Sequence, residues 1–188
     1  MVRPLTLLFA VCFLACSAPD PRPRTLYRDA RRDLSRDRNT AAFTKKVRER
    51  MEDRYDKVDT LFIEGKLVTA EDLLYAAALL VTSDDAADLD RAQTLAMESA
   101  TLGEKRALPV AAEAEDKLLL MKGLAQRFGT QYAYQPSFGT WRLYAIDPTT
   151  TDEDRAFMGL PTLAEMEART EELNDEHLTQ LLLSRVPE

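Results

Sequence analysis

The chain has 188 residues, of which 45% are hydrophobic and 30% charged, with a formal net charge of −7 and a pI near 4.9. This composition is typical of a folded globular protein and excludes a disordered one. The acidic pI and a predicted export signal argue against a nucleic-acid partner.

Residues 1–15 have the layout of a secretory signal peptide. Arg3 precedes an apolar run from Leu5 to Ala15, which is far shorter than the roughly 20 residues that span a bilayer. The ending "FLAC" resembles a bacterial lipobox, with Phe13 where leucine is usual, and implies that Cys16 is the lipidated first residue of the mature protein. The alternative is an ordinary secretory signal and a spare thiol. We favour lipidation because both cysteines lie in this segment.

The lipobox resemblance implies a covalent diacylglyceryl group and an N-acyl chain on Cys16, no other cofactor, and the membrane as a partner. Each buried methylene of such chains contributes about 0.8 kcal/mol. Ser17 after the cysteine, by similarity to enterobacterial lipoproteins, favours the outer membrane over the inner one. The predicted location is therefore the bacterial cell envelope, lipid-anchored and facing the periplasm. Residues 16–24, with alternating prolines, predict an extended tether of about 20–25 Å.

Residues 25–64 predict a basic helical segment. From 22 to 54 there are 12 Arg and Lys against 6 Asp and Glu, whereas residues 55–188 carry 12 against 25. The basic side chains either lie near anionic lipid headgroups or pair locally with acids such as Asp29, Asp33 and Asp37. Both interpretations stay open. An apolar helical stripe ends before Gly65 and comprises Phe43, Val47, Met51, Tyr55, Val58 and Phe62.

Residues 65–188 predict one mainly α-helical domain, either a helical bundle or a set of helix hairpins. Capping boxes start three helices, at Thr69 with Asp72, Thr151 with Asp154 and Thr162 with Glu165. Ser83 is expected to head a further helix. The small-residue helices between 70 and 123 have a distant similarity to tetratricopeptide or Sel1-like units. The acids of "SDDAADLD" lack the calcium-loop pattern and are interpreted as helix-terminus charges.

The pattern changes after Gly123. Two aromatic segments, "TQYAYQP" and "WRLYAID", predict a β-hairpin at about residues 131–146. A proline turn, a short capped helix and a longer terminal helix follow. The expected fold class is therefore mainly α, with a small β-hairpin and a terminal helix near the C-terminus.

Residues 65–175 resemble an uncharacterised bacterial family, the domain of unknown function 6624. The resemblance rests on "QRFGTQ", a tryptophan-containing strand, Asp-Pro, an acid-rich turn and Pro-Leu-Ala-Glu. The matching positions are Gln126, Arg127, Phe128, Gly129, Thr130, Gln131, Trp141, Asp147, Pro148, Asp152, Arg155, Pro161, Leu163, Ala164 and Glu165. The chain departs from the family at Val81–Ser83, where a Gln-His pair is expected, and at Ala125, where proline is usual. The family has no established activity, so the resemblance leaves function open.

Two hypotheses remain for the motif. As a ligand site, Gln126, Arg127, Thr130, Gln131 and Asp147 would offer a bidentate cation, amides, a hydroxyl and a carboxylate. As scaffold, the glutamines would satisfy backbone groups at a helix-to-hairpin junction while Arg127 pairs with Asp147 or Asp152.

The chain has no serine-hydrolase motif, phosphate-binding loop or metal-ligand cluster, and its one histidine is His177. We therefore favour a lipid-anchored envelope protein that binds an envelope protein or a peptide over an enzyme or small-ligand binder, and predict no catalytic or metal-binding residue.

Overall fold

The computed structural model describes residues 22–35 and 41–183, without the side chains of 41–43 and 177–183. The predicted signal peptide, Cys16 and most of the predicted tether therefore lie outside the described residues, as do the side chains of Phe43 and His177. In chain order the elements are α1 (Pro23–Leu34), α2 (Ala41–Ile63), α3 (Ala70–Leu80), α4 (Ala86–Thr101), the short 3-10 helix η1 (Lys105–Ala107), α5 (Leu108–Met121), β1 (Tyr132–Gln135), β2 (Thr140–Leu143), α6 (Asp152–Phe157) and α7 (Leu163–Leu183). The predicted mainly helical class with a small hairpin is confirmed.

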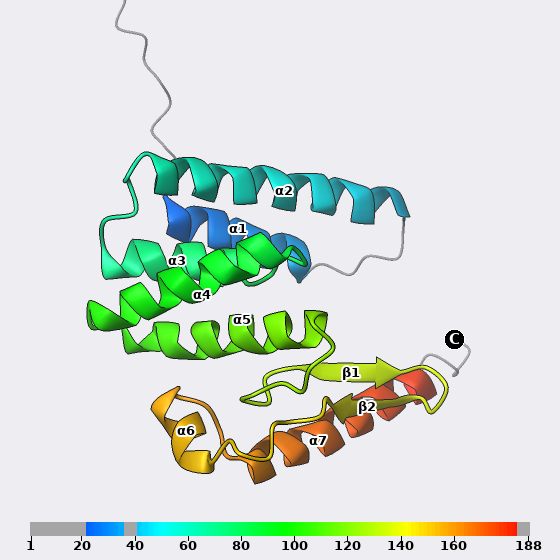
Figure 1. The fold of residues 1–188 in the computed structure, drawn as a ribbon. Coiled ribbons are helices and arrows are strands. Elements are labelled where there is room, and N and C mark those ends of the chain that lie inside the picture. The colour runs from blue at the N-terminus through cyan, green and yellow to red at the C-terminus, as the bar shows by residue number, and fades with distance from the viewer. Residues whose placement is uncertain (1–21, 36–40, 184–188) are drawn as a thin grey trace, which may run out of the picture.

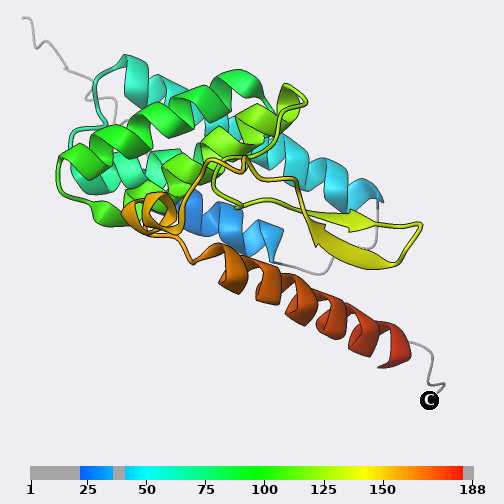
Figure 2. The ribbon, with the colours of Figure 1, turned by 60° about the horizontal axis from the view of Figure 1, so that its bottom comes forward.

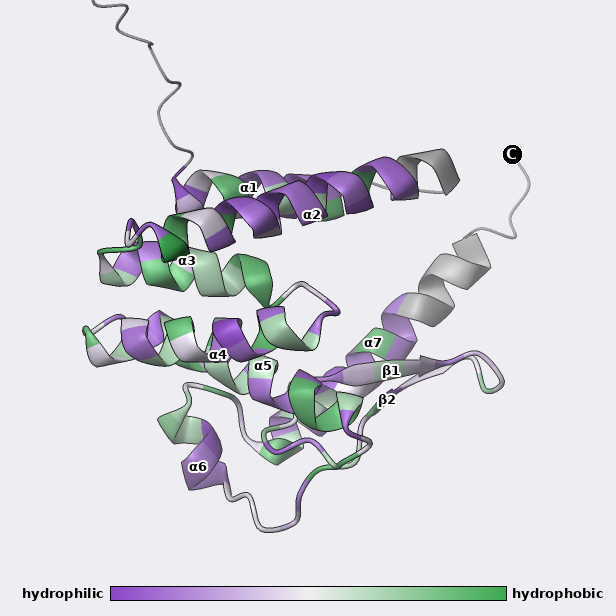
Figure 3. Ribbon diagram, turned by 45° about the horizontal axis from the view of Figure 1, so that its top comes forward, coloured by the Kyte–Doolittle hydropathy of each residue, from purple (hydrophilic) through white to green (hydrophobic). Residues whose placement is uncertain are grey.

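The elements form stacked layers (Figure 1). In that view α1 and α2 lie above α3, α4 and α5 follow below it, and the hairpin, α6 and α7 form the bottom of the molecule. The core runs through α3, whose residues 76–80 are all buried because small and apolar side chains occupy nearly its whole circumference. Figure 3 shows this contrast, with α3 mostly hydrophobic and α2 mostly hydrophilic.

The basic segment is two helices, and the first begins inside the predicted tether. Pro23 opens α1 as its first helical residue, a position where the missing N–H costs nothing. A salt-bridge clamp joins the two helices: Asp33 of α1 accepts hydrogen bonds from Arg50 at 2.9 and 3.1 Å and from Arg54 at 2.6 Å. Local pairing, one of the two interpretations of these charges, therefore holds for Asp33.

The buried stripe of α2 differs from the predicted one at its C-terminal end. Val47, Met51 and Val58 are buried as expected, but Phe62 is 46% exposed and Leu61 is buried in its place. The reason is Arg54, which lies on the buried face because the clamp neutralises its charge, so the stripe passes through 54 and 61. A hydrophobicity pattern cannot predict an arginine on that face.

Local capping signals define most helix starts. The capping boxes of Thr69 with Asp72 and Thr151 with Asp154 both form, and Thr162 and Glu165 exchange the same pair of hydrogen bonds. Ser83 is not the cap of α4. Asp85 takes that position, accepting from the N–H groups of residues 87 and 88, because a carboxylate is the stronger acceptor for the helix's free donors.

The hairpin leans on the terminal helix. β1 and β2 pair antiparallel, with Tyr132 opposite Leu143 and Tyr134 opposite Trp141. Asn174 of α7 closes the outer edge of β2, since its side chain accepts the Trp141 N–H at 2.6 Å and donates to the Trp141 carbonyl at 3.2 Å. The Asn174 amide thus takes the place of a third strand.

Candidate functional site

The QRFGTQ segment is wound around one buried carboxylate. Asp116 of α5 is fully buried, and its Oδ1 accepts the N–H groups of Arg127 at 2.6 Å and Phe128 at 2.9 Å. Its Oδ2 accepts the N–H of Thr130 at 2.9 Å and the Thr130 hydroxyl at 2.8 Å. Because Asp116 follows Ala112 by one helical turn on the buried face of α5, the loop is held directly against the helix.

Gln126 holds the same loop from its other side. Its side chain is fully buried, donates to the carbonyls of Gln131 and Tyr144 at 3.1 Å each, and accepts the Gln131 N–H at 2.9 Å. Its main chain bonds to Ala145 and Asp147 in a parallel bridge. All the polar groups of Gln126 are therefore engaged in joining the motif to the segment that follows β2.

Arg127 points away from this junction. Its guanidinium is half exposed and bonds to Glu115 at 3.1 Å, so the predicted pairing with Asp147 or Asp152 is wrong. Asp152 instead pairs with Arg155, which is 2% exposed and also donates to the Phe128 carbonyl at 3.2 Å. Arg155 takes this role because α6 turns it into the interior, beneath the loop.

The other predicted ligand-binding residues are also bonded within the fold. Asp147 approaches the motif through its main chain, while its carboxylate accepts two hydrogen bonds from Thr149, and these bonds lower its pKa. The Gln131 amide donates to the Thr130 hydroxyl at 3.0 Å. Gly129 has φ +92°, and a Cβ there would lie 2.7 Å from the sulfur of Met166, so no other residue fits without a shift.

Arg127 does line a small cavity of about 250 Å³, between α4, the loop and α6. Glu115, Phe128 and the exposed Phe157 share it. The geometry thus brings Gln126, Thr130 and Gln131 together as a junction around Asp116. The two charged candidates, Arg127 and Asp147, keep their charged groups near solvent, each bonded to a neighbouring residue of the fold.

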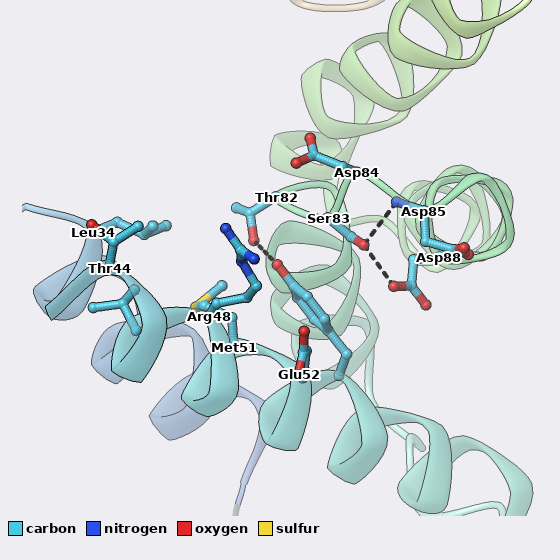
Figure 4. Close-up of a pocket in the computed structure, with 12 residues that line it drawn as sticks. Leu34, Thr44, Arg48, Met51, Glu52, Thr82, Ser83, Asp84, Asp85 and Asp88 are labelled. Atoms are coloured by element: carbon cyan, nitrogen blue, oxygen red, sulfur yellow. Dashed lines mark hydrogen bonds between the residues drawn. The ribbon is translucent and has the colours of Figure 1, made fainter. Parts of the chain in front are cut away.

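A larger cleft lies between α2 and the turn that joins α3 to α4 (Figure 4). Its volume is about 550 Å³, within the range of roughly 300–1,000 Å³ that is usual for ligand pockets. Val47, Met51 and Leu34 supply an apolar wall, and the half-buried Tyr55 also lines the cleft. The remaining lining residues are Thr44, Arg48, Glu52, Thr82, Ser83, Asp84, Asp85 and Asp88.

The charges of the cleft are mostly negative. Four carboxylates, at positions 52, 84, 85 and 88, face a single cation, Arg48. Asp85 and Asp88 are engaged, since Asp85 caps α4 and Asp88 accepts the Ser83 hydroxyl at 2.7 Å. Glu52 and Asp84 make no hydrogen bond or ion pair with any residue that the structure describes. The cleft therefore offers free negative charge beside an apolar wall.

Tyr55 is fixed and neutral in this cleft. The Thr82 hydroxyl lies 3.0 Å from the Tyr55 hydroxyl and also 2.6 Å from the Leu79 carbonyl. Because Thr82 has one hydroxyl hydrogen and gives it to that carbonyl, Tyr55 is the donor to Thr82. Burial raises the pKa of Tyr55, and the charges of Asp88 and Asp84 raise it further. The Tyr55 oxygen can accept a hydrogen bond from a bound cation.

Neither Asp116 nor this cleft was predicted from the sequence. Asp116 follows Ala112 by four residues and so lies on the apolar side of its helix. An acid in that position is a signal that could have predicted a buried carboxylate. The cleft has no such signal, because it forms only where α2 meets a turn some 30 residues away in sequence.

Comparisons with protein-family models, with curated proteins and with solved structures found no match to this chain. Within residues 22–35 and 41–183, no three His, Cys, Asp or Glu side chains are grouped so that they could hold a metal ion. None of the described helices is long and apolar enough to span a membrane.

Proposed function

We propose that this chain is a lipid-anchored protein of the bacterial cell envelope and that its folded part is a binding module. The partner is a basic peptide segment of another envelope protein, which docks in the cleft between α2 and the α3–α4 turn. The anchor is Cys16, supported by the "FLAC" lipobox and by the confinement of both cysteines to the signal segment. We also propose that the chain belongs to the family of unknown function 6624, on the residues given above.

The observation that carries the proposal is the pairing of charge and apolar wall in one cleft. Glu52 and Asp84 are free to meet a lysine or arginine, while Val47 and Met51 offer a surface for an apolar side chain. A peptide that alternates basic and apolar residues has both features. Charge complementarity of this kind favours the correct partner and excludes acidic ones.

The QRFGTQ motif has a different role in this proposal. Its amides, hydroxyl and backbone groups are already bonded to Asp116, to Gln126 and to the segment that follows β2. The motif therefore supports the module rather than acting on a ligand, and no catalytic residue is assigned.

Binding is tested by titrating two probe peptides, one alternating lysine with leucine and one alternating glutamate with leucine, and following backbone amide NMR signals. The lysine peptide is expected to shift signals around Tyr55 and Asp84, and Asp84→Asn with Glu52→Gln should weaken its affinity about tenfold. Asp90→Asn with Glu98→Gln, which neutralises two exposed acids of α4 outside the cleft lining, is the matched control. Equal binding of both peptides, or equal losses in variant and control, would refute the cleft as the site.

The anchor is tested separately. Mass spectrometry of the mature protein purified from membranes is expected to find acyl and diacylglyceryl groups on Cys16. A Cys16→Ser chain should carry neither. An unmodified Cys16 would contradict the anchor and leave the cleft experiment unaffected.

A further inference from the structure

The exposed side of α1 carries a row of arginines. Arg24, Arg28 and Arg31 are exposed and follow at spacings of four and three, so they lie on one side of the helix. The opposite side, with Leu26 and Ala30, is buried in the core. The row is therefore held outward by the packing of the helix and cannot turn inward.

Acidic side chains do little to neutralise this row. Arg24 and Arg28 each approach a carboxylate at 3.6 Å, those of Glu71 and Asp29, in exposed pairs that contribute little. Arg31 makes no ion pair with any residue that the structure describes. Asp33, the other described acid of α1, is buried in the clamp with α2.

The row also borders a groove whose lining is basic and aromatic. Its volume is about 490 Å³, and besides the three arginines it is lined by Thr25, Tyr27 and Tyr75. Arg24 lies over the Tyr75 ring, with its guanidinium carbon 5.6 Å from the centroid. One guanidinium group can bind two oxygens of a phosphate at once, and tyrosine rings favour the interface between headgroups and water.

The predicted anchor fixes where this surface can be. Only seven peptide units separate Cys16 from Pro23, the first residue of α1, and a chain of that length reaches at most about 25 Å. The start of the arginine row is thus confined close to the lipid, where even a weak attraction to the headgroups is effective. Residues 55–188, with 12 basic against 25 acidic residues, are repelled by the same surface.

We propose that Arg24, Arg28 and Arg31 of α1 form a docking surface for the anionic phospholipids of the membrane that holds the lipid anchor. The surface orients the protein, with α1 toward the headgroups. This inference rests on the proposed anchor but not on the peptide-binding cleft. Each arginine near an anionic surface favours the docked orientation about fivefold, so the three together favour it on the order of a hundredfold.

The test uses the mature lipidated protein with a fluorophore on a single introduced cysteine, Ser35→Cys. Ser35 is exposed and lies one turn beyond Arg31 on the same side of α1. The protein is placed in phosphatidylcholine vesicles with or without phosphatidylglycerol, each with a nitroxide quencher on a small share of lipid headgroups. A second probe, Ser137→Cys, reports from the hairpin turn, which Figures 1 and 2 place away from α1.

Docking predicts strong quenching at position 35 only in phosphatidylglycerol vesicles, and weak quenching at position 137. The quenching should disappear at about 1 M salt, where the Debye length is about 3 Å, and in R24Q/R28Q/R31Q. The control K122Q/R142Q/R169Q removes the same number of exposed positive charges outside α1 and should keep the quenching at position 35. Quenching that ignores phosphatidylglycerol, or that both triple variants share, overturns the proposal.

Failure of the anchor gives a different result. If the protein does not float with pure phosphatidylcholine vesicles, Cys16 carries no effective lipid. The surface is then decided by flotation with phosphatidylglycerol vesicles, in which the wild type and the control variant should float and the R24Q/R28Q/R31Q variant should not. Equal flotation of all three, or of none, overturns the docking surface.

Discussion

Replacing Asp116 with asparagine is expected to destabilise the protein strongly, although the side chain keeps its size. Each carboxylate oxygen accepts two hydrogen bonds, at 2.6–2.9 Å. If Oδ1 becomes the amide nitrogen, the N–H groups of residues 127 and 128 lose their acceptor and face another N–H. If Oδ2 does, the Thr130 N–H loses its acceptor, whereas the Thr130 hydroxyl can turn and accept from the new amide. A hydrogen bond to a charged group contributes about 1.5–3 kcal/mol, so losing one or two of them should lower the free energy of unfolding by about 1.5–6 kcal/mol.

Glu115→Gln is the matched control for this variant. It makes the same chemical change at the neighbouring position, where the carboxylate pairs with the half-exposed Arg127. Such a pair contributes at most about 1 kcal/mol. Urea denaturation followed by circular dichroism measures both variants. If Asp116→Asn loses no more than Glu115→Gln, the QRFGTQ loop is not held by this carboxylate, and the assignment of the motif as scaffold is wrong.

Three further predictions concern the same fold. Gln126→Ala removes three buried hydrogen bonds and should cost about 3 kcal/mol of unfolding free energy by urea denaturation; a loss below about 1 kcal/mol would contradict its role in the junction. Gly129→Ala should lower the melting temperature more than Gly65→Ala, because both have positive φ but only the first would place a Cβ 2.7 Å from the Met166 sulfur, so that this side chain must move; equal shifts would argue against that contact. Hydrogen bonds from two arginines of α2 lower the pKa of Asp33 from 3.8 to about 2, so this carboxylate stabilises the folded state above pH 3.8, and about 1–2 kcal/mol should be lost as the pH falls to about 2. Asp33→Asn should lack that part of the pH dependence, and an unchanged acid transition would count against the clamp.

Features that depend on residues close in sequence could be predicted well. A capping box needs only two residues three positions apart, and all three predicted boxes form. The hairpin and the buried character of α3 follow in the same way from alternation and from an apolar run. In each case the signal lies within one short stretch of the sequence.

Features that depend on partners far away in the sequence could not be predicted. The burial of Arg54 is explained only by its salt bridge with Asp33, 21 positions earlier in the sequence. The ion-pair partner of Arg127 depends on how α5 and the loop are placed in space. The cap of α4 was placed two residues too early for a local reason, because Ser83 and Asp85 are both good caps, and the carboxylate of Asp85 is the stronger acceptor while the Ser83 hydroxyl bonds to Asp88.

The candidate site shows the same limit. The motif could be found from the sequence, and scaffold was one of its two interpretations. The signal for Asp116, an acid on the apolar side of a helix, does not connect that residue to the motif. Polar residue types alone do not distinguish a loop that binds a ligand from one that binds its own helix. The difference lies in whether the donors already have acceptors, and that is a property of the folded chain.

The bond between Asn174 and Trp141 has a consequence for the self-association of the protein. An unpaired strand edge is a template for pairing with another chain, and Asn174 blocks one such edge in β2. The protection is conditional, since it lasts only while α7 stays docked. Proteolysis or misfolding that removes α7 would leave the rest of the domain with an adhesive edge, so intact molecules should remain monodisperse while clipped ones self-associate.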